Sequence, residues 1–551
     1  MITVLVSEIY KLDSLQITME KLLEKEETEN EKSEAAESED VVQDEQLKVI
    51  LLHYKPNHKH PVKLVQMGED GEEKQYTYEE MQDMILEYEK NLQDQYPDQV
   101  QRIEMYDTSK WKALNQVINN LDTDYFQVIH AGDSIRQEML LNLVDYMDEV
   151  GEGADILLMN LYDSKNPIKG AKPRAEEGVY SLDYVDWFRK NELTLADCIV
   201  RYSSWENIQF KEDGGHGYAP YAVCMMELAN RKRTLATYRG KYKGLGYVDI
   251  AGRAEREKTK ENTEEFYIDE LKKNYLPALQ WIREQSQSVP RDVQYYMYGE
   301  LCNRFRYNMN TKDKRLLTGE KLDEFKDICK DMLGYIDDDI IFGYPKSAKK
   351  YAPGVALAYT MIQIKYGEDL KIEYGLQKRE RVSVQLKIND QYLPNELVPT
   401  VRLDLMEYEK NVLRMEFAAQ KYVGPEGIQV TVLVNENEYP VEETTRYSHT
   451  KFFGESGYKM YTFAVEIPYK QLEGRNTISF KLKQMGNAIQ LPITSGRYVS
   501  KIHSGIPGSY WCFGGYMVRF KDKIKPNAII IEKAGKKKRI IQELRVLKNM
   551  W

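Results

Sequence analysis

The stretch "TDYFQVIHAGDSIRQEMLLNLVDYM" (residues 123–147) decides the fold that we expect for the first part of the chain. A short apolar run, 125–129, is followed by His-Ala-Gly-Asp (130–133) and then by a segment with the periodicity of a helix. The apolar face of that helix comprises Ile135, Met139, Leu143 and Met147. A strand that turns directly into a helix at a carboxylate is typical of α/β sheets whose strand ends bind ligands.

Asp133 and His130 allow two interpretations. Ser134 and Gln137 are spaced as a capping box, and an acid just ahead of a helix is stabilised by the helix dipole. Alternatively, Asp133 holds a metal ion, with His130 as a weaker ligand, at the mouth of the sheet beside an open cleft. His130 is otherwise a structural histidine at the end of its strand.

The same alternation of strand and helix extends on both sides of this stretch. Apolar runs at 3–6, 47–52, 102–106 and 154–159 are separated by amphipathic helices. "TYEE" (77–80) is a capping box that opens one of these helices. The pattern predicts a mostly parallel sheet that is covered by helices on both faces.

The remaining chain has a different character. The 551 residues are too many for one hydrophobic core. We expect the α/β domain at 1–255, a helical accessory region at 256–376, a β-sandwich at 377–533 and a basic helix at 534–551. Segment 24–46 holds eleven acidic residues and two lysines, which predicts a disordered surface insertion.

Charge and cysteine usage exclude some classes of function. The net charge of −11 arises mostly from the acidic segment, so the rest is near neutral and gives no support for nucleic-acid binding. The five cysteines lie far apart, which favours buried free thiols in a reducing cytosol. We identify no signal peptide and no apolar run that could span a membrane. The basic C-terminal segment allows peripheral contact with a membrane surface.

The order of elements over roughly residues 1–250 resembles the family 2 glycosyltransferases of the GT-A fold. Strings that carry the resemblance are "LVSEIYK" (5–11), "VILLHYKPN" (49–57), "KALNQVI" (112–118) and "VIHAGD" (128–133). The fold implied is a GT-A-like α/β domain with a Rossmann-like sheet. The regions behind it resemble the accessory parts of bacterial enzymes that build teichoic acids and capsule polysaccharides.

Carrying the family motifs over position by position assigns roles to several residues. Ser7 and Ile9 stand at the first nucleotide-binding turn, and His53 stands where an aspartate would contact the base. Asn115 matches the asparagine of the family's Ala-Arg-Asn-x-Gly helix. These four residues form the nucleotide-binding set that the resemblance implies.

The metal and base positions are altered. His130 and Gly132 replace the two aspartates of the Asp-x-Asp motif, and Asp133 matches the acid that often follows it. His216 is a weak candidate for the catalytic base, because Ala219 and Pro220 replace the usual Glu-Asp pair. The resemblance implies Mn²⁺ or Mg²⁺ if transfer occurs.

Three functions follow as alternatives. The first is a cytoplasmic family 2-like glycosyltransferase in cell-surface polysaccharide or teichoic-acid biosynthesis, either free or peripheral at the inner face of the plasma membrane. It would use a nucleotide-sugar donor and a glycan or polyol-phosphate acceptor. The second is a pseudoenzyme without a cofactor that supports a partner transferase. The third is the amino-terminal part of a CDP-glycerol glycerophosphotransferase.

Overall fold

The computed structural model forms two compact units, and each is described by itself. One unit comprises Met1–Arg304 and Leu316–Ile336, and the other comprises Phe305–Arg315 and Asp337–Trp551. The structure describes residues 1–24, 46–54, 64–67, 73–149, 154–158, 160–162, 178–181, 198–214, 219–231, 234–237, 247–249, 263–310, 316–342, 355–378, 382–397, 400–409, 411–419, 428–495, 511–513, 515–521, 527–536 and 540. The acidic insertion and most of the basic C-terminal helix lie outside these residues.

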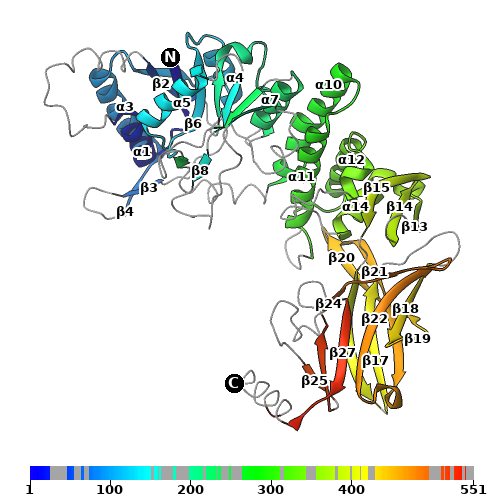
Figure 1. The fold of residues 1–551 in the computed structure, drawn as a ribbon. Coiled ribbons are helices and arrows are strands. Elements are labelled where there is room, and N and C mark those ends of the chain that lie inside the picture. Colours follow the sequence, from blue (N-terminus) through cyan, green and yellow to red (C-terminus); the bar gives the residue numbers. More distant parts are fainter. Residues whose placement is uncertain are drawn as a thin grey trace. The chain divides into compact units, whose positions relative to one another are not determined.

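A mixed sheet organises the first unit (Figure 1). Its described strands run in the order β5-β2-β1-β6-β10-β7-β11-β9. They are β1 (Ile2–Ser7), β2 (Leu47–Tyr54), β5 (Val100–Met105), β6 (Tyr125–His130), β7 (Ile156–Leu158), β9 (Gly178–Ser181), β10 (Cys198–Arg201) and β11 (Thr234–Thr237). The pairs β1–β2, β1–β6 and β2–β5 are parallel, whereas β10 runs antiparallel to both of its neighbours. The expected mostly parallel sheet is therefore confirmed, with β10 and β9 reversed.

Helices cover both faces of this sheet. The first face packs against α1 (Leu12–Leu23), α3 (Tyr78–Gln95) and α5 (Gln137–Glu149). The side chains that β1 and β2 bury there are Ile2, Val4, Val6, Leu47, Val49 and Leu51. Their alternation is the period-2 pattern of a strand with one face in each core. Two short ribbons, β3 (Leu64–Met67) with β4 (Glu73–Tyr76) and β8 (Asn160–Tyr162) with β12 (Tyr247–Asp249), complete this α/β part.

The second face carries α4 (Lys110–Ile118) and α7 (Ala219–Asn230). Trp111 of α4 contacts Tyr221 of α7 with ring centroids 5.0 Å apart, and it also contacts Phe210 at 5.4 Å. Trp205, in the 3-10 turn η3 (Tyr202–Trp205), joins Phe210 to Phe126 on β6. The Trp111–Tyr221 and Phe126–Trp205 pairs are edge-to-face, an arrangement that aromatic rings favour because of their quadrupoles.

One predicted helix start is confirmed and one is wrong. Thr77 and Glu80 form the reciprocal capping box that "TYEE" predicts. The box predicted at Ser134 and Gln137 does not cap α5, because that helix begins only at Gln137. The carboxylate of Asp133 instead turns back and accepts a hydrogen bond from the His130 backbone N–H at 3.1 Å.

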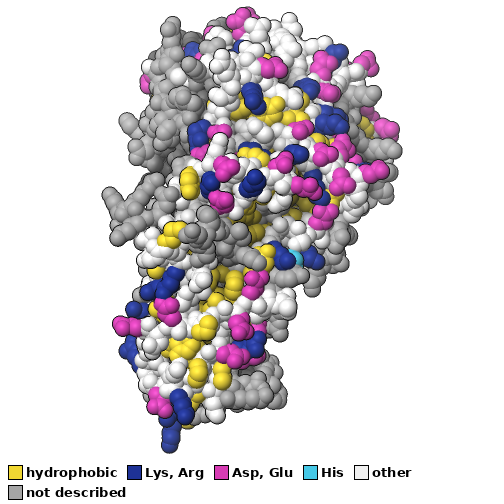
Figure 2. Space-filling model, turned by 90° about the vertical axis from the view of Figure 1, so that its right-hand side faces the viewer, with side chains coloured by type: hydrophobic (Ala, Val, Ile, Leu, Met, Phe, Trp, Pro, Cys, Tyr) yellow, Lys and Arg dark blue, Asp and Glu magenta, His cyan; other side chains and the backbone are white. Residues whose placement is uncertain are grey.

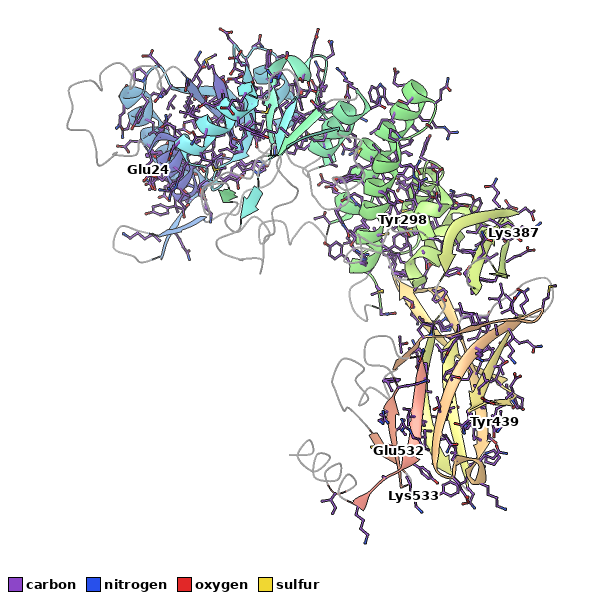
Figure 3. All side chains as sticks on the ribbon, in the orientation of Figure 1. Glu24, Tyr298, Lys387, Tyr439, Glu532 and Lys533 are labelled. Carbon is purple, nitrogen blue, oxygen red and sulfur yellow. The ribbon has the colours of Figure 1, made fainter. Side chains whose placement is uncertain are left out.

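The helical segment that follows the sheet is confirmed. Its members in the first unit are α9 (Glu264–Tyr267), the π-helical turn η5 (Leu271–Tyr275), α10 (Leu276–Ser286), α11 (Arg291–Tyr307, which continues into the second unit) and α12 (Glu320–Leu333). Tyr298 on α11, labelled in Figure 3, has no exposed surface. The predicted domain boundaries at 255/256 and 376/377 stay predictions.

The second unit begins with α13 (Asp338–Phe342), α14 (Val355–Tyr366) and the 3-10 turn η7 (Gly367–Asp369). A three-stranded sheet follows, formed by β13 (Ile372–Lys378), β14 (Val382–Ile388) and β15 (Gln391–Leu397). Figure 3 shows Lys387 on β14.

A β-sandwich makes up the rest of the second unit. One sheet has the order β20-β21-β17-β16-β24, and the other has β19-β18-β22-β27-β26-β25 with β23 beside β22. Phe417 and Phe480, both fully buried, meet between the two sheets with centroids 4.8 Å apart, as the sandwich prediction requires. The strands are β16 (Val401–Glu409), β17 (Val412–Ala419), β18 (Gln429–Val434), β19 (Asn437–Tyr439), β20 (Glu442–Phe452), β21 (Glu455–Pro468), β22 (Arg475–Gln484), β23 (Asn487–Gln490), β24 (Ile493–Ser495), β25 (Trp511–Phe513), β26 (Tyr516–Phe520) and β27 (Ala528–Lys533), with the 3-10 turn η8 (Tyr469–Leu472) after β21.

Two expectations from the composition concern the charge of the surface and the state of the cysteines. The face drawn in Figure 2 carries basic and acidic side chains side by side. Four cysteines, Cys198, Cys224, Cys302 and Cys329, are buried free thiols, as predicted. Among the described residues, no helix combines the length and the apolar character needed to cross a membrane.

Candidate functional site

The strand order changes direction at the carboxyl ends of β1 and β6, and the region at these two strand ends is called the β1/β6 crevice below. The chain leaves β1 for β2 on one side and later returns to β6 on the other side, so the connections diverge at this point. In open α/β sheets ligands bind where the strand order reverses in this way. Ser7 lies opposite His130 at the two strand ends, so the residues that follow them line the candidate site.

Glu8, directly after β1, has an unusual backbone. Its φ of 58° lies in the left-handed region, which a glutamate rarely adopts. Residues held in such regions cost on the order of 1–3 kcal/mol and concentrate at functional sites. The Glu8 side chain is about one-third exposed and forms an ion pair with Lys110.

Lys110 is the buried cation of the crevice. It is the first residue of α4, whose N-cap Ser109 accepts a hydrogen bond from the backbone of Lys112. Its Nζ lies 4.9 Å from the ring centroid of Trp111 and 5.3 Å from that of Tyr221. Burial by itself would lower the pKa of Lys110, but the Glu8 carboxylate raises it above its ordinary value, so the ammonium stays charged.

His130 faces this ammonium. Its Nε2 lies 3.4 Å from Nζ of Lys110 and 3.8 Å from Oε1 of Glu8. An ammonium only donates hydrogen bonds, so Nε2 must accept in this contact. The ring nitrogen that the sequence suggested as a metal ligand therefore points at a positive charge.

Two tyrosines border the same cluster. Burial, followed by the charge of Glu8, raises the pKa of Tyr10 to about 12. Burial also raises the pKa of Tyr54, at the end of β2, well above its ordinary value. Both phenols are therefore neutral at physiological pH.

Asp133 lies in the fold interior, and the expectation that it borders an open cleft is wrong. Its side chain has no exposed surface. Thr18 of α1 donates its hydroxyl to the Asp133 carbonyl at 2.6 Å and accepts the Gly132 N–H at 2.8 Å. Gly132 has a φ of 100°, so this turn needs a glycine. The backbone of this turn is thus held to α1 by two hydrogen bonds with Thr18.

Ser7 and Ile9 are also turned inward. The Ser7 hydroxyl donates to the Ile129 carbonyl at 3.2 Å and is fully buried. Ile9 packs within the core of the first face. Their nucleotide-binding roles stay predictions, since the Ser7 hydroxyl bonds a backbone carbonyl and the Ile9 side chain packs in the core.

His53 belongs to a buried ionic group next to the crevice. Its Nε2 lies 2.8 Å from Oε1 of Glu89, whose other oxygen accepts from Arg102 Nε at 2.7 Å. Glu89, on α3, is fully buried and is thus paired on both oxygens. The position predicted to contact a base is held by this group.

Asn115 clamps the chain that leads to α7. Its side-chain amide donates to the Phe210 carbonyl at 2.7 Å, and its oxygen accepts the Phe210 N–H at 2.8 Å. Both peptide groups of a buried aromatic residue are satisfied in this way. His216, the predicted base, lies outside the described residues.

The described residues do not fit a divalent cation at the predicted position. Mn²⁺ and Mg²⁺ need several hard oxygen ligands, but the Asp133 carboxylate is buried against backbone and His130 faces an ammonium. Among the described residues, no group of three or more His, Cys, Asp or Glu side chains could hold a metal.

Sequence reasoning missed Glu8 and Lys110. Both signals were present, since Glu8 directly follows the first strand and Lys110 directly follows the helix cap Ser109. A lysine at a helix start usually reads as a solvated charge. Only the pairing across 102 residues reveals that this one is buried.

Comparisons with known proteins give a remote relationship. No protein-family profile matches the chain. The minor teichoic acid biosynthesis protein GgaB of Bacillus subtilis (strain 168) is 18% identical over 468 residues, which cover 84% of this chain and 49% of that protein. The chain thus spans about half the length of that relative.

Solved structures give weak matches. The crystal structure of S. aureus TarS aligns with a TM-score of 0.41 at 12% identity, covering 98% of this chain and 86% of that one. TarS 1–349 in complex with UDP-GlcNAc aligns with a TM-score of 0.38 at 12% identity, over 72% and 99% of the two chains. The sequence match to GgaB agrees with the predicted resemblance: over most of its length, this chain is similar to a protein of teichoic acid biosynthesis.

Proposed function

We propose that this protein binds a nucleotide-activated sugar in the β1/β6 crevice and acts as a glycosyltransferase in the assembly of a teichoic-acid-type surface polymer. The observation that carries the proposal is the switch point in the α/β sheet, with the Glu8–Lys110 ion pair at the ends of its strands. The sequence similarity to GgaB, across 84% of the chain, supports the polymer class.

The chemistry of such a transfer requires positive charge near the donor. The diphosphate leaving group gains negative charge as the glycosidic bond breaks, and this charge must be stabilised. Lys110 places a permanent cation at the crevice. The neutral phenols of Tyr10 and Tyr54 lie near Glu8 in the same cluster.

Binding of donors tests the proposal directly. Titration calorimetry with UDP-, CDP- and GDP-linked sugars, each with and without Mn²⁺, should give micromolar binding of one nucleotide class. Incubation of that donor with teichoic-acid acceptors should then release the nucleoside diphosphate. If no donor binds measurably with or without Mn²⁺, the glycosyltransferase function is excluded.

A second function is favoured by one observation, the engagement of Asp133 with the backbone of its own turn. A chain without a free carboxylate at that position would bind a donor or a partner transferase without turning over. Donor binding with no release of nucleoside diphosphate, with any acceptor, would select this non-catalytic role.

A further inference from the structure

We propose that Lys110 is the diphosphate-binding residue of the crevice, that it replaces a divalent cation, and that Glu8 occupies the phosphate position until the ligand displaces it. The identity of the ligand as a nucleoside diphosphate rests on the proposed function. The anion site itself rests on the geometry of Glu8, Lys110 and His130.

The first argument is the placement of the charge. Lys110 lies at the carboxyl edge between β1 and β6, and its Nζ contacts both Glu8, which follows β1, and His130, which ends β6. A ligand that enters the switch point and displaces Glu8 therefore reaches this ammonium. The faces of Trp111 and Tyr221 flank it and exclude water from one side, which strengthens its attraction for an anion.

The second argument is the nature of the partner. Glu8 is about one-third exposed whereas Lys110 is almost entirely buried. The carboxylate thus reaches the ammonium from the solvent side, and a phosphate oxygen could take its place by the same route. The left-handed backbone of Glu8 stores strain that a change in the turn would release.

The third argument is the poor fit of a metal ion. A divalent cation beside His130 would lie next to the Lys110 ammonium, which repels it. Asp133, the remaining predicted ligand, has its carboxylate on the His130 backbone N–H. The positive charge that the diphosphate needs is thus supplied by the chain.

The experiment is a set of calorimetric titrations with UDP, CDP, GDP and inorganic pyrophosphate, in EDTA and in Mn²⁺. The variants are Lys110→Met and Glu8→Gln, with Lys112→Met as a matched control because Lys112 lies on the same helix and is exposed. A charge-assisted hydrogen bond supports a loss of about tenfold or more in Lys110→Met. Glu8→Gln should bind several-fold more tightly, since the competing anion is gone. Lys112→Met should match the parent.

The possible outcomes separate the Lys110 anion site from the proposed function. Nucleotide binding that requires Mn²⁺, or that Lys110→Met leaves intact in EDTA, overturns this inference and leaves the proposed function standing. Pyrophosphate binding through Lys110 without any nucleotide binding keeps the anion site and excludes the proposed function. No binding of any anion overturns both. If Lys110→Met fails to fold, Glu8→Gln decides alone, because weaker or unchanged binding there contradicts the displacement.

Discussion

Two buried cations in the first unit differ in how their partners are arranged. Arg304, in the helical segment, has no exposed surface, and it bonds Glu270 at 2.9 Å, Glu300 at 2.8 Å and the Phe266 carbonyl at 2.8 Å. Lys110, at the sheet edge, is paired with a carboxylate that reaches solvent and with a histidine nitrogen at 3.4 Å.

The difference separates a structural charge from one that a ligand can use. Arg304 is held by two carboxylates and a backbone carbonyl, and Glu270 is only 2% and Glu300 17% exposed, so an anion would have to displace several bonds to reach the guanidinium. The Glu8 carboxylate is about one-third exposed and can be hydrated when an entering phosphate replaces it at Lys110. Burial of a cation therefore does not by itself show whether a ligand can bind to it. The exposure of its carboxylate partner distinguishes the two cases.

The largest expected effect comes from Arg304→Met. Removing one member of a buried ion pair leaves Glu270 uncompensated and should cost about 3–5 kcal/mol in the free energy of unfolding. Urea denaturation measures this loss. Lys321→Met, which breaks an exposed pair with Glu264, should cost less than about 1 kcal/mol. Equal losses in the two variants would contradict the comparison.

A neutral polar clamp should rank second. Asn115→Ala leaves the buried N–H and C=O of Phe210 unpaired and should lower the unfolding free energy by about 2–3 kcal/mol. The control is Asn120→Ala at an exposed position, where the side-chain amide donates to the Gln116 carbonyl of the preceding turn. A loss within about 0.5 kcal/mol is expected there. If Asn115→Ala lowers the unfolding free energy by no more than the control does, the N–H and C=O of Phe210 do not need the Asn115 side chain.

The pH dependence of the unfolding free energy above pH 10 tests whether the Tyr10 phenol is buried beside Glu8. The folded-state pKa of Tyr10 is raised to about 12, so its contribution is complete below pH 10 and is lost as the pH rises toward 12. One such group contributes a slope of at most about 1.4 kcal/mol per pH unit. Tyr10→Phe should flatten the decline between pH 10 and 11 and change little at pH 7, as followed by urea unfolding. An unchanged slope would place Tyr10 in contact with water.

The smallest effect should come from Lys110→Met. The methionine side chain suits the aromatic surroundings, and the freed Glu8 carboxylate can hydrate, so we expect a change within about 1 kcal/mol in urea denaturation. A loss as large as that of Arg304→Met would make the Glu8–Lys110 pair structural and would remove the distinction between the two cations.

Local patterns predicted the elements of the fold well. The apolar runs became β1, β2, β5, β6 and β7, and in β1, β5 and β6 the run is followed directly by the predicted helix. The capping box at Thr77 formed as its residues require. The box at Ser134 failed because a tertiary contact, the hydrogen bonding of Thr18 to the turn at Gly132, competes with local capping.

The sequence predicted where the candidate site lies, at the end of the strand 125–130, but it did not predict which side chains meet there. The strand order alone places His130 at the switch point, where a site belongs. The sequence cannot show that Asp133 turns inward, since one peptide N–H of the same turn captures its carboxylate. Nor can it show that Lys110 meets Glu8, because that pairing depends on how α4 crosses the sheet edge.

The π-helical turn η5 has a consequence for engineering this protein by recombination. Asn274 in that turn donates to the Gly214 carbonyl at 2.8 Å, and the Lys273 carbonyl accepts from Lys211 at 2.7 Å. A Cβ on Gly214 would meet Pro220 at 2.7 Å, so the fit is close. A chimaera that joins the sheet of one homologue to the helices of another at residue 255 would separate these partners. Segments 198–231 and 263–304 should therefore be exchanged together.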